Sequence, residues 1–327
     1  MVSTKFIQKI DLRYYKLVYR VGKKLNKKDK DITKRLINRP VLSIASDEFA
    51  DTFSQYVKNQ KPMLLARLGG TEGNVAGEYC EKRLGLRRAY SDTVINWFYT
   101  TSGFFADDYA NKEQAMDQYA ELTLEGIKEC DFLSAFFPTR VYMPFFFKYY
   151  TQNAVATYSD SGPCFDKPTD KHWIRELKGK RVLIINNFTE SIEYQWNRKS
   201  LLVKSKEYEL PDFELLLYKT YVTQVGERPG GFTNFFQVLE KMKSDISKIE
   251  FDIALIGAGA YGFPLAVEVK KMGKIAMETC SHTPIFFGIY GERDLKYGCE
   301  KYMTDAWIRP LEEPPKRYKE VENGCYW

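Results

Sequence analysis

Three glycines carry the pattern best suited to binding a ligand: Gly257, Gly259 and Gly262 form a G-x-G-x-x-G. The pattern follows an apolar run and opens an amphipathic one, where a strand would lead into a helix. Glycines let the backbone approach a phosphate, and a helix N-terminus offers it unpaired N–H groups. Glu278, twenty-one residues after the first glycine, could then hold a ribose hydroxyl. The pattern predicts a nucleotide or nucleotide-sugar site; the alternative is a tight strand–helix turn without a ligand.

A second glycine turn follows a short apolar run and reads Arg67-Leu-Gly69-Gly70-Thr71-Glu72. A guanidinium can bind a diphosphate through two parallel hydrogen bonds. The carboxylate of Glu72 could ligate a divalent cation or contact a sugar hydroxyl. Both side chains should lie at the carboxyl ends of parallel strands, the edge at which α/β folds bind ligands. The alternative is an Arg67–Glu72 ion pair that only closes the turn.

Weaker candidates follow other predicted strands. Asn187 lies near the end of an apolar run, so its amide should reach the same sheet edge. His282 could act as a base, although a single histidine without a partner visible in the sequence is more often structural. Arg293 follows a glycine turn and is a further candidate for binding the ligand. No G-x-S-x-G and no P-loop occurs, which disfavours serine hydrolases and P-loop kinases.

The elements that must position these residues alternate between apolar runs and amphipathic helices. A capping serine followed by acids predicts a helix that starts at Ser46. Such alternation is typical of an α/β fold with a Rossmann-like, mostly parallel sheet and helices on both faces. Strands are predicted at 63–66, 132–137, 181–188, 213–222, 251–256 and 274–279, and further helices at 113–130, 233–248 and 263–272.

The composition excludes several other classes. The chain has 327 residues, 44% of them hydrophobic and 28% charged, as in soluble globular proteins. Its longest uncharged stretch, 253–267, is shorter than the roughly 20 residues that a membrane-spanning helix needs. Without a recognisable signal peptide, we expect a cytoplasmic protein. Two histidines and six scattered cysteines exclude a zinc cluster, so any catalytic metal would be a hard cation held by oxygen ligands.

The positive charge is concentrated at the N-terminus. Residues 1–40 hold thirteen Lys and Arg and three Asp, a net charge of +10, so the remaining 287 residues sum to −4. This arm is either a helix docked on its own domain, or a surface helix that binds an anionic membrane, where each basic side chain contributes about 1 kcal/mol. Without a basic stripe in the body, no nucleic acid is expected. The apolar residues of the arm recur at helical spacing: Phe6, Ile10, Tyr14, Leu17 and Val21.

The ordered set of motifs resembles the GT-D type glycosyltransferases. The matching segments are ARLGGTEG (66–73), KRVLIINNFTESI (180–192), ALIGAGAYGFPLAVEVKKMGK (254–274) and FFGIYGER (286–293). The resemblance covers about 46–293 and implies a catalytic domain over 41–309, between the basic arm at 1–40 and a loose tail at 310–327. It also implies sugar transfer from a nucleotide-diphosphate donor such as a UDP-sugar.

The same resemblance implies a divalent cation, Mn²⁺ or Mg²⁺, at a D-x-E motif that aligns with Gly70-Thr71-Glu72. Gly70 replaces the aspartate, which leaves Glu72 as the one carboxylate of the motif. Basic side chains can neutralise a leaving diphosphate in place of a metal. Together, the motifs and the resemblance give Arg67, Glu72 and His282 as candidate catalytic residues, and the candidate ligand-binding residues are Gly69, Gly70, Thr71, Asn187, Gly257, Gly259, Gly262, Glu278 and Arg293.

The favoured function is therefore transfer of a sugar to a glycan or glycoconjugate, in the assembly of a cell-surface polysaccharide or a glycoprotein glycan. The basic arm would bring the enzyme to lipid-linked acceptors at the inner face of the membrane. The alternative is a nicotinamide- or flavin-binding oxidoreductase that uses the glycine pattern at 257–262 and Glu278. A third interpretation is a non-catalytic nucleotide-binding or scaffold protein.

Overall fold

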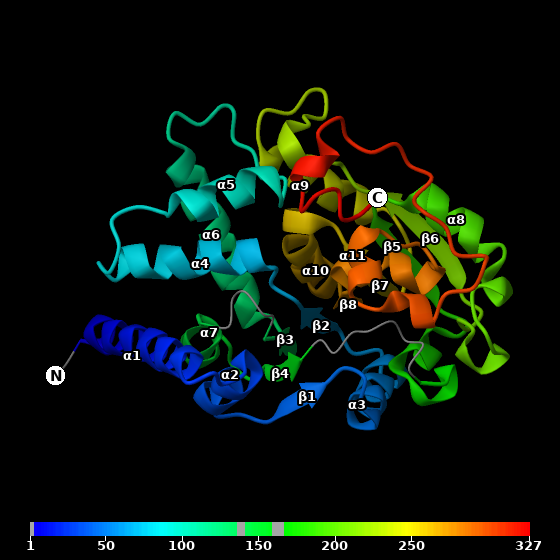
Figure 1. The fold of residues 1–327 in the computed structure, drawn as a ribbon, viewed down its shortest axis with the longest axis horizontal. Helices are drawn as coiled ribbons and strands as arrows, with labels where there is room; N and C mark the ends of the chain where they lie inside the picture. Colours follow the sequence, from blue (N-terminus) through cyan, green and yellow to red (C-terminus); the bar gives the residue numbers. More distant parts are fainter. Residues whose placement is uncertain (1–2, 136–140, 159–166) are drawn as a thin grey trace.

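A single parallel sheet organises the protein, whose computed structural model describes residues 3–135, 141–158 and 167–327 (Figure 1). Its strand order is β1-β4-β3-β2-β8-β7-β5-β6, and every strand pairing is parallel. This confirms the Rossmann-like α/β fold. The strands are β1 (Val41–Ser43), β2 (Met63–Ala66), β3 (Phe132–Ser134), β4 (Val155–Tyr158), β5 (Arg181–Asn186), β6 (Glu214–Lys219), β7 (Ile253–Gly257) and β8 (Ile275–Glu278).

Helices cover both faces of the sheet, as expected for strands that are buried on two sides. Successive side chains of β2 enter different cores, with Leu64 in the cluster formed with α4, α6 and α10, and Leu65 in the cluster formed with α3. The helices are α1 (Thr4–Lys24), α2 (Asp29–Ile37), α3 (Asp47–Lys58), α4 (Gly70–Arg83), α5 (Asp92–Thr100), α6 (Lys112–Lys128), α7 (Met143–Tyr149), α8 (Thr189–Trp196), α9 (Phe235–Ile246), α10 (Gly262–Lys271) and α11 (Glu292–Lys296).

Most predicted elements are present, with shifted ends. Ser46 caps α3 by accepting a hydrogen bond from the N–H of Phe49 at 3.1 Å. The predicted strand 132–137 is described only over β3, because residues 136–140 lie outside the described residues. Two strands were not predicted, β1 and β4. They are three and four residues long and, unlike the equally short β2, contain Ser43 and Thr157 instead of a continuous apolar run.

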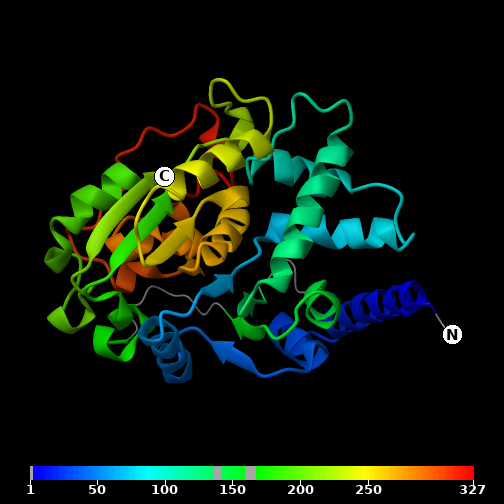
Figure 2. The same ribbon diagram turned by 180° about the vertical axis from the view of Figure 1, so that it is seen from behind.

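The N-terminal arm packs on the body, as expected for the docked helix that is one of the two alternatives for residues 1–40. Leu12 and Tyr15 of α1 and Ile37 of α2 belong to the same core as α4 and α7. Both views place α1 at the outer end of the molecule, away from the centre of the sheet (Figures 1 and 2). The arm is therefore anchored through one face of α1.

The C-terminal segment is also packed, so the expectation of a loose tail at 310–327 is wrong. Val321 and Cys325 are buried. The ring of Trp327 packs edge-on against Phe188, at the carboxyl end of β5, with centroids 5.5 Å apart. The segment runs across the carboxyl edge of the sheet (Figure 1, red). It thus contributes to the ligand-binding edge rather than extending into solvent.

Candidate functional site

The carboxyl ends of the central strands surround a pocket of about 1310 Å³. β2 and β8 lie side by side there although about 200 residues separate them, and the pocket extends past the ends of β7, β5 and β6. Helices α5 and α11 and the C-terminal segment complete the wall. Eleven of the twelve predicted site residues line this pocket: Arg67, Gly69, Gly70, Thr71, Glu72, Asn187, Gly257, Gly259, Glu278, His282 and Arg293. Gly262 is the exception.

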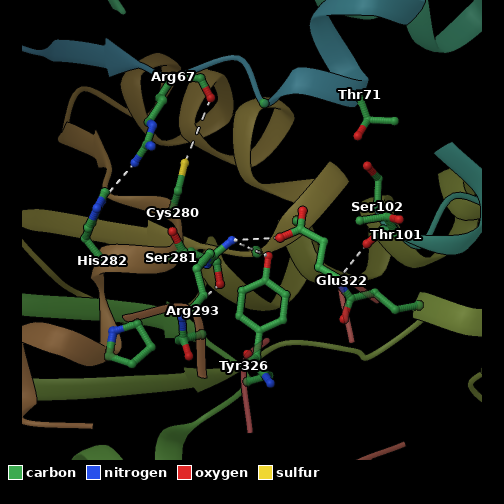
Figure 3. Close-up of a pocket in the computed structure, with 18 of the residues that line it drawn as sticks. Arg67, Thr71, Thr101, Ser102, Cys280, Ser281, His282, Arg293, Glu322 and Tyr326 are labelled. Atoms are coloured by element: carbon green, nitrogen blue, oxygen red, sulfur yellow. Dashed lines mark hydrogen bonds and ion pairs between the residues drawn. The ribbon is translucent and has the colours of Figure 1, made fainter. Parts of the chain in front are cut away.

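Arg67 and His282 form a direct contact at the ends of β2 and β8. The guanidinium Nη1 lies 2.8 Å from Nδ1 of the imidazole (Figure 3). Because a guanidinium has donors only, Nδ1 must accept this hydrogen bond, and the proton of the neutral ring lies on Nε2. Burial, followed by the charges of Arg67 and Arg293, lowers the pKa of His282 to about 3. His282 is therefore a neutral acceptor that orients Arg67, and its remaining ring nitrogen, Nε2, carries a proton, which does not fit the base suggested by the sequence.

Arg293 brings a second guanidinium to the pocket and is held by the C-terminal segment. Its guanidinium stacks over the ring of Tyr326, 4.5 Å from the centroid, and Nη1 lies 3.4 Å from the phenol oxygen. The carboxylate of Glu322 lies 3.9 Å from the same nitrogen. In Figure 3, Tyr326 reaches Arg293 from below and Glu322 reaches it from the right, while Arg67 and His282 lie together at the upper left. The sequence offered no signal for this support, since Tyr326 is 33 residues away.

Glu72 lies in the first turn of α4, and Gly69 is the N-cap of that helix. A Cβ added to Gly69 would lie 2.1 Å from Oε2 of Glu72, so the carboxylate folds back over the turn into the space that the glycine leaves. The carboxylate also accepts hydrogen bonds from its own N–H and from Ser102. Burial outweighs both bonds and raises the pKa of Glu72. Thr71, Thr101 and Ser102 place hydroxyl groups opposite the basic side chains (Figure 3).

Glu278 joins the two central strands and has a different role from the predicted one. Its Oε2 accepts a hydrogen bond from the backbone N–H of Arg67 at 2.8 Å. A Cβ on Gly262 would lie 3.0 Å from Oε1, which explains that glycine by packing. Burial raises the pKa of Glu278 to about 8, and the nearby Glu72 adds to the shift. With one oxygen bonded to the backbone and the other facing Gly262, the carboxyl group positions Arg67.

The turn at 257–262 is closed by protein groups. A Cβ on Gly257 would lie 2.3 Å from the carbonyl oxygen of Cys280, and the amide of Asn186 donates to the Gly257 carbonyl at 2.9 Å. Gly259 has a φ of +52°, and the N–H of Ala260 donates to the Ser102 carbonyl at 3.3 Å. The Ala260 N–H, one of the groups that we expected to bind a phosphate, is therefore already hydrogen-bonded to a protein oxygen. The glycine at position 257 thus lets the carboxyl ends of β5, β7 and β8 pack closely together.

The predicted divalent cation does not fit the side chains that are present. Gly70 supplies no ligand, Glu72 is bonded to its own backbone and Ser102, and Glu278 is bonded to Arg67. Burial raises the pKa of both carboxyl groups, which disfavours the ionised form that a hard cation requires. Within the described ranges, no group of three or more His, Cys, Asp or Glu side chains could hold a metal ion. We therefore derive no step through a metal.

Sequence reasoning missed the groups that come from distant segments. Ser102 follows α5, a helix that the sequence analysis did not predict, and its carbonyl and hydroxyl oxygens contact both glycine turns. Trp97 of α5 is 50% exposed at the pocket, and Tyr297, after α11, is 81% exposed. The one local signal is Ser91, which is followed by Asp92 and caps α5 by accepting a hydrogen bond from the N–H of Val94.

No protein-family model and no curated protein matches this chain. Two solved structures are similar to it. One, described as a selenomethionine-substituted domain of unknown function 1792, has 12% identity and a TM-score of 0.44, and the match covers 90% of this chain and 98% of that one. The other, described as a highly conserved domain of unknown function 1792 with a distinct glycosyltransferase fold, has 11% identity and a TM-score of 0.39, with coverages of 91% and 94%.

Proposed function

We propose that this protein is a glycosyltransferase that binds a nucleotide-diphosphate sugar at the carboxyl edge of its sheet. The observation that supports this most is that two largely buried guanidiniums, Arg67 and Arg293, line the same pocket as two carboxyl groups whose pKa values are raised. These are the carboxyl groups of Glu72 and Glu278. Burial disfavours the charged form of the two carboxyl groups, whereas the guanidiniums keep their charge, and this difference favours an anion as the ligand. Two guanidiniums suit a diphosphate, each through parallel hydrogen bonds to its oxygens.

The size of the pocket supports a reaction between two substrates. Its volume of about 1310 Å³ exceeds the roughly 300–1,000 Å³ of an ordinary small-molecule pocket. A nucleotide-diphosphate sugar would fill one part and leave room for an acceptor. Trp97 and Tyr297 present exposed aromatic rings at the pocket, and such rings stack against the apolar faces of sugars. We assign this side to a glycan or glycoconjugate acceptor.

In the proposed transfer, the basic groups stabilise the leaving diphosphate. As the bond between the sugar and the diphosphate breaks, charge develops on the phosphate oxygens, and Arg67 and Arg293 neutralise it without reorganisation. His282, neutral and bonded to Arg67 through Nδ1, fixes the guanidinium in place. Glu72, next to the hydroxyl groups of Thr71 and Ser102, would hold a sugar hydroxyl.

The alternative, a nicotinamide- or flavin-binding oxidoreductase, would depend on the glycine pattern at 257–262. The Ser102 carbonyl bonds to Ala260 within that pattern, and Glu278 bonds to the Arg67 backbone instead of facing a ribose. No observation in the described residues favours this alternative over sugar transfer.

A thermal-shift panel separates the two functions. A ligand that binds only the folded state stabilises it by about 2.7 kcal/mol at a hundred times its Kd. We expect uridine or another nucleoside diphosphate to raise the Tm, and NAD(H) and FAD to have no effect. Mass detection of a glycosylated product with a panel of donors then tests transfer itself. Stabilisation by NAD(H) alone would contradict the proposal.

A further inference from the structure

Helix α1 has two apolar faces, and only the smaller one is covered. Leu12 and Tyr15 are buried against the body, with 0% and 8% of their surface exposed. We call the opposite face the outer stripe, and its residues keep between 44% and 65% of their surface exposed. The outer stripe consists of Phe6, Ile7, Ile10, Tyr14, Leu17, Val21 and, just after the helix, Leu25.

The outer stripe is an unusual concentration of exposed apolar surface. The described residues contain thirteen exposed large hydrophobic side chains, and seven of them lie between Phe6 and Leu25. The remaining six are scattered over five other parts of the chain, from Trp97 to Leu311. Single exposed apolar residues are ordinary, whereas a contiguous patch marks an interaction surface. The stripe therefore needs a partner.

Polar contacts fix the direction in which the stripe faces. Lys16 forms an ion pair with the buried Glu81 of α4. Asp11 accepts hydrogen bonds from Lys148 and from the Tyr149 hydroxyl, both in α7. These contacts and the buried apolar face hold α1 in one orientation. The stripe is thus presented away from the body by a fixed helix and cannot turn inward without breaking them.

Positive charge borders the stripe on one side. At 100° per residue, five basic positions besides Lys16 and Lys23 fall in the arc between the buried face and the stripe. The acid within the helix, Asp11, is engaged by α7 on the other border. The five positions are Lys5, Lys9, Arg13, Arg20 and Lys24.

We propose that α1 is a membrane-docking surface that lies flat on a bilayer containing anionic lipids. The apolar stripe would enter the boundary between headgroups and acyl chains, and the basic border would contact the lipid phosphates. Within the described residues, no helix is long and apolar enough to cross a membrane, so the contact is with the surface. The ligand is thus a layer of anionic lipid phosphates that covers hydrocarbon chains: the basic border binds the phosphates, and the stripe contacts the hydrocarbon.

A second copy of this chain is the other possible occupant. Two copies paired antiparallel through the stripe would bring their basic borders together, because a two-fold axis places the same border on the same side. Repulsion along two rows of five basic residues opposes that pairing, whereas anionic lipid removes the repulsion. The charge pattern therefore favours the membrane. This proposal rests on α1 alone and does not depend on the proposed sugar transfer.

Co-sedimentation of the full chain with vesicles tests the proposal. We expect binding to vesicles of phosphatidylcholine mixed with phosphatidylglycerol, and little binding to phosphatidylcholine alone. Binding should weaken between about 0.01 M and about 1 M salt, as the screening length falls from about 30 to about 3 Å. The double variant Ile10→Ser, Leu17→Ser should bind at least about tenfold more weakly, since two apolar side chains no longer leave water.

A matched control replaces an exposed apolar residue far from α1. Leu201→Ser removes a side chain that is 58% exposed, a value close to those of Ile10 and Leu17, and should leave vesicle binding unchanged. Nucleoside-diphosphate thermal shifts of all variants should equal those of the wild type, which separates docking from ligand binding. Equal vesicle binding by the double variant and the wild type would overturn the proposal. So would a wild-type dimer in solution that the double variant abolishes, because the stripe would then join two copies.

Discussion

The two glycine turns of the sheet edge look alike in sequence and differ in structure. The turn at 257–262 matches a known binding pattern, yet the Cys280 carbonyl oxygen lies against Gly257 and the Ser102 carbonyl accepts a hydrogen bond from the N–H of Ala260. The turn at 67–73 matches no common pattern, yet it brings the Arg67 guanidinium and the Glu72 carboxyl group to the pocket. A glycine thus shows only that something lies close to the backbone. Whether that neighbour is protein or ligand follows from the packing.

The largest effect should follow from removing the Arg67 guanidinium. Arg67→Ala should lower transfer by at least about tenfold with a natural donor, because charge-assisted contacts to a diphosphate are worth about 1.5–3 kcal/mol. The fold should persist, since Glu278 bonds to the backbone N–H of Arg67, which alanine retains. Turnover measured with saturating donor checks this expectation.

His282→Asn is the matched control for Arg67→Ala. It keeps the guanidinium but removes the imidazole that orients it, so we expect a smaller loss of turnover. The pH profile should also keep its shape, because a histidine with a pKa of about 3 is not the base. Wild-type turnover in Arg67→Ala would contradict the site.

Adding one methyl group to each turn should separate their roles. Gly257→Ala would place Cβ 2.3 Å from a backbone oxygen, so the strand ends must move, at a cost of about 1–3 kcal/mol of unfolding free energy. Gly69→Ala would meet the flexible end of Glu72 at 2.1 Å, which can turn away. We expect the first variant to lose stability, and the second to lose turnover with a smaller change in Tm. Chemical denaturation and turnover of both variants are the measurements, and the reverse pattern would exchange the roles of the two turns.

The sequence predicts the central sheet well because its strands are buried on both faces. Met63–Ala66 has no exposed residue, and a continuous apolar run is the direct consequence of that burial. The helical spacing of apolar residues in the sequence also predicts the outer stripe of α1, but it does not predict which face of this helix packs against the body. The larger apolar face of that helix points outward, and the contacts that decide this, such as Lys16 with Glu81, join residues 65 positions apart.

The contacts that hold Arg293 could not be predicted either, because they too join residues that are far apart in the sequence. Tyr326 and Glu322 reach it because the C-terminal segment crosses the sheet edge, and no local pattern encodes that path. The charged and proline-rich composition of 310–327 is typical of a loose tail, yet Val321 and Cys325 within it are buried. Tertiary packing overrode composition there.

Glu278, which contacts the Arg67 backbone on one side and Gly262 on the other, should make the stability of the protein depend on pH. The pKa of Glu278 is about 8 in the folded protein against an ordinary value of 4.5, so the folded state favours the protonated form. Its contribution is fully present below about pH 4.5 and is lost as pH rises through about 8. Glu278→Gln keeps an acceptor for the Arg67 N–H and has no proton to lose. Thermal unfolding of both proteins over this range should show the wild type falling relative to the variant as pH increases, and parallel curves would contradict the shift.

The smallest expected effect is that of removing divalent cations. The side chains around Glu72 offer one carboxyl group with a raised pKa and no aspartate at Gly70, so two guanidiniums would balance the donor's charge instead. Binding of a nucleoside diphosphate should therefore change by less than about twofold when EDTA replaces Mg²⁺ or Mn²⁺, a difference of about 0.4 kcal/mol. Gly70→Asp provides the matched comparison, because it restores the second carboxylate of the D-x-E motif and should make affinity rise with Mn²⁺. Calorimetric titration of both proteins with and without EDTA measures this. Loss of wild-type binding in EDTA would show that Glu72 holds a cation after all, and would move the diphosphate from Arg67 and Arg293 to the metal.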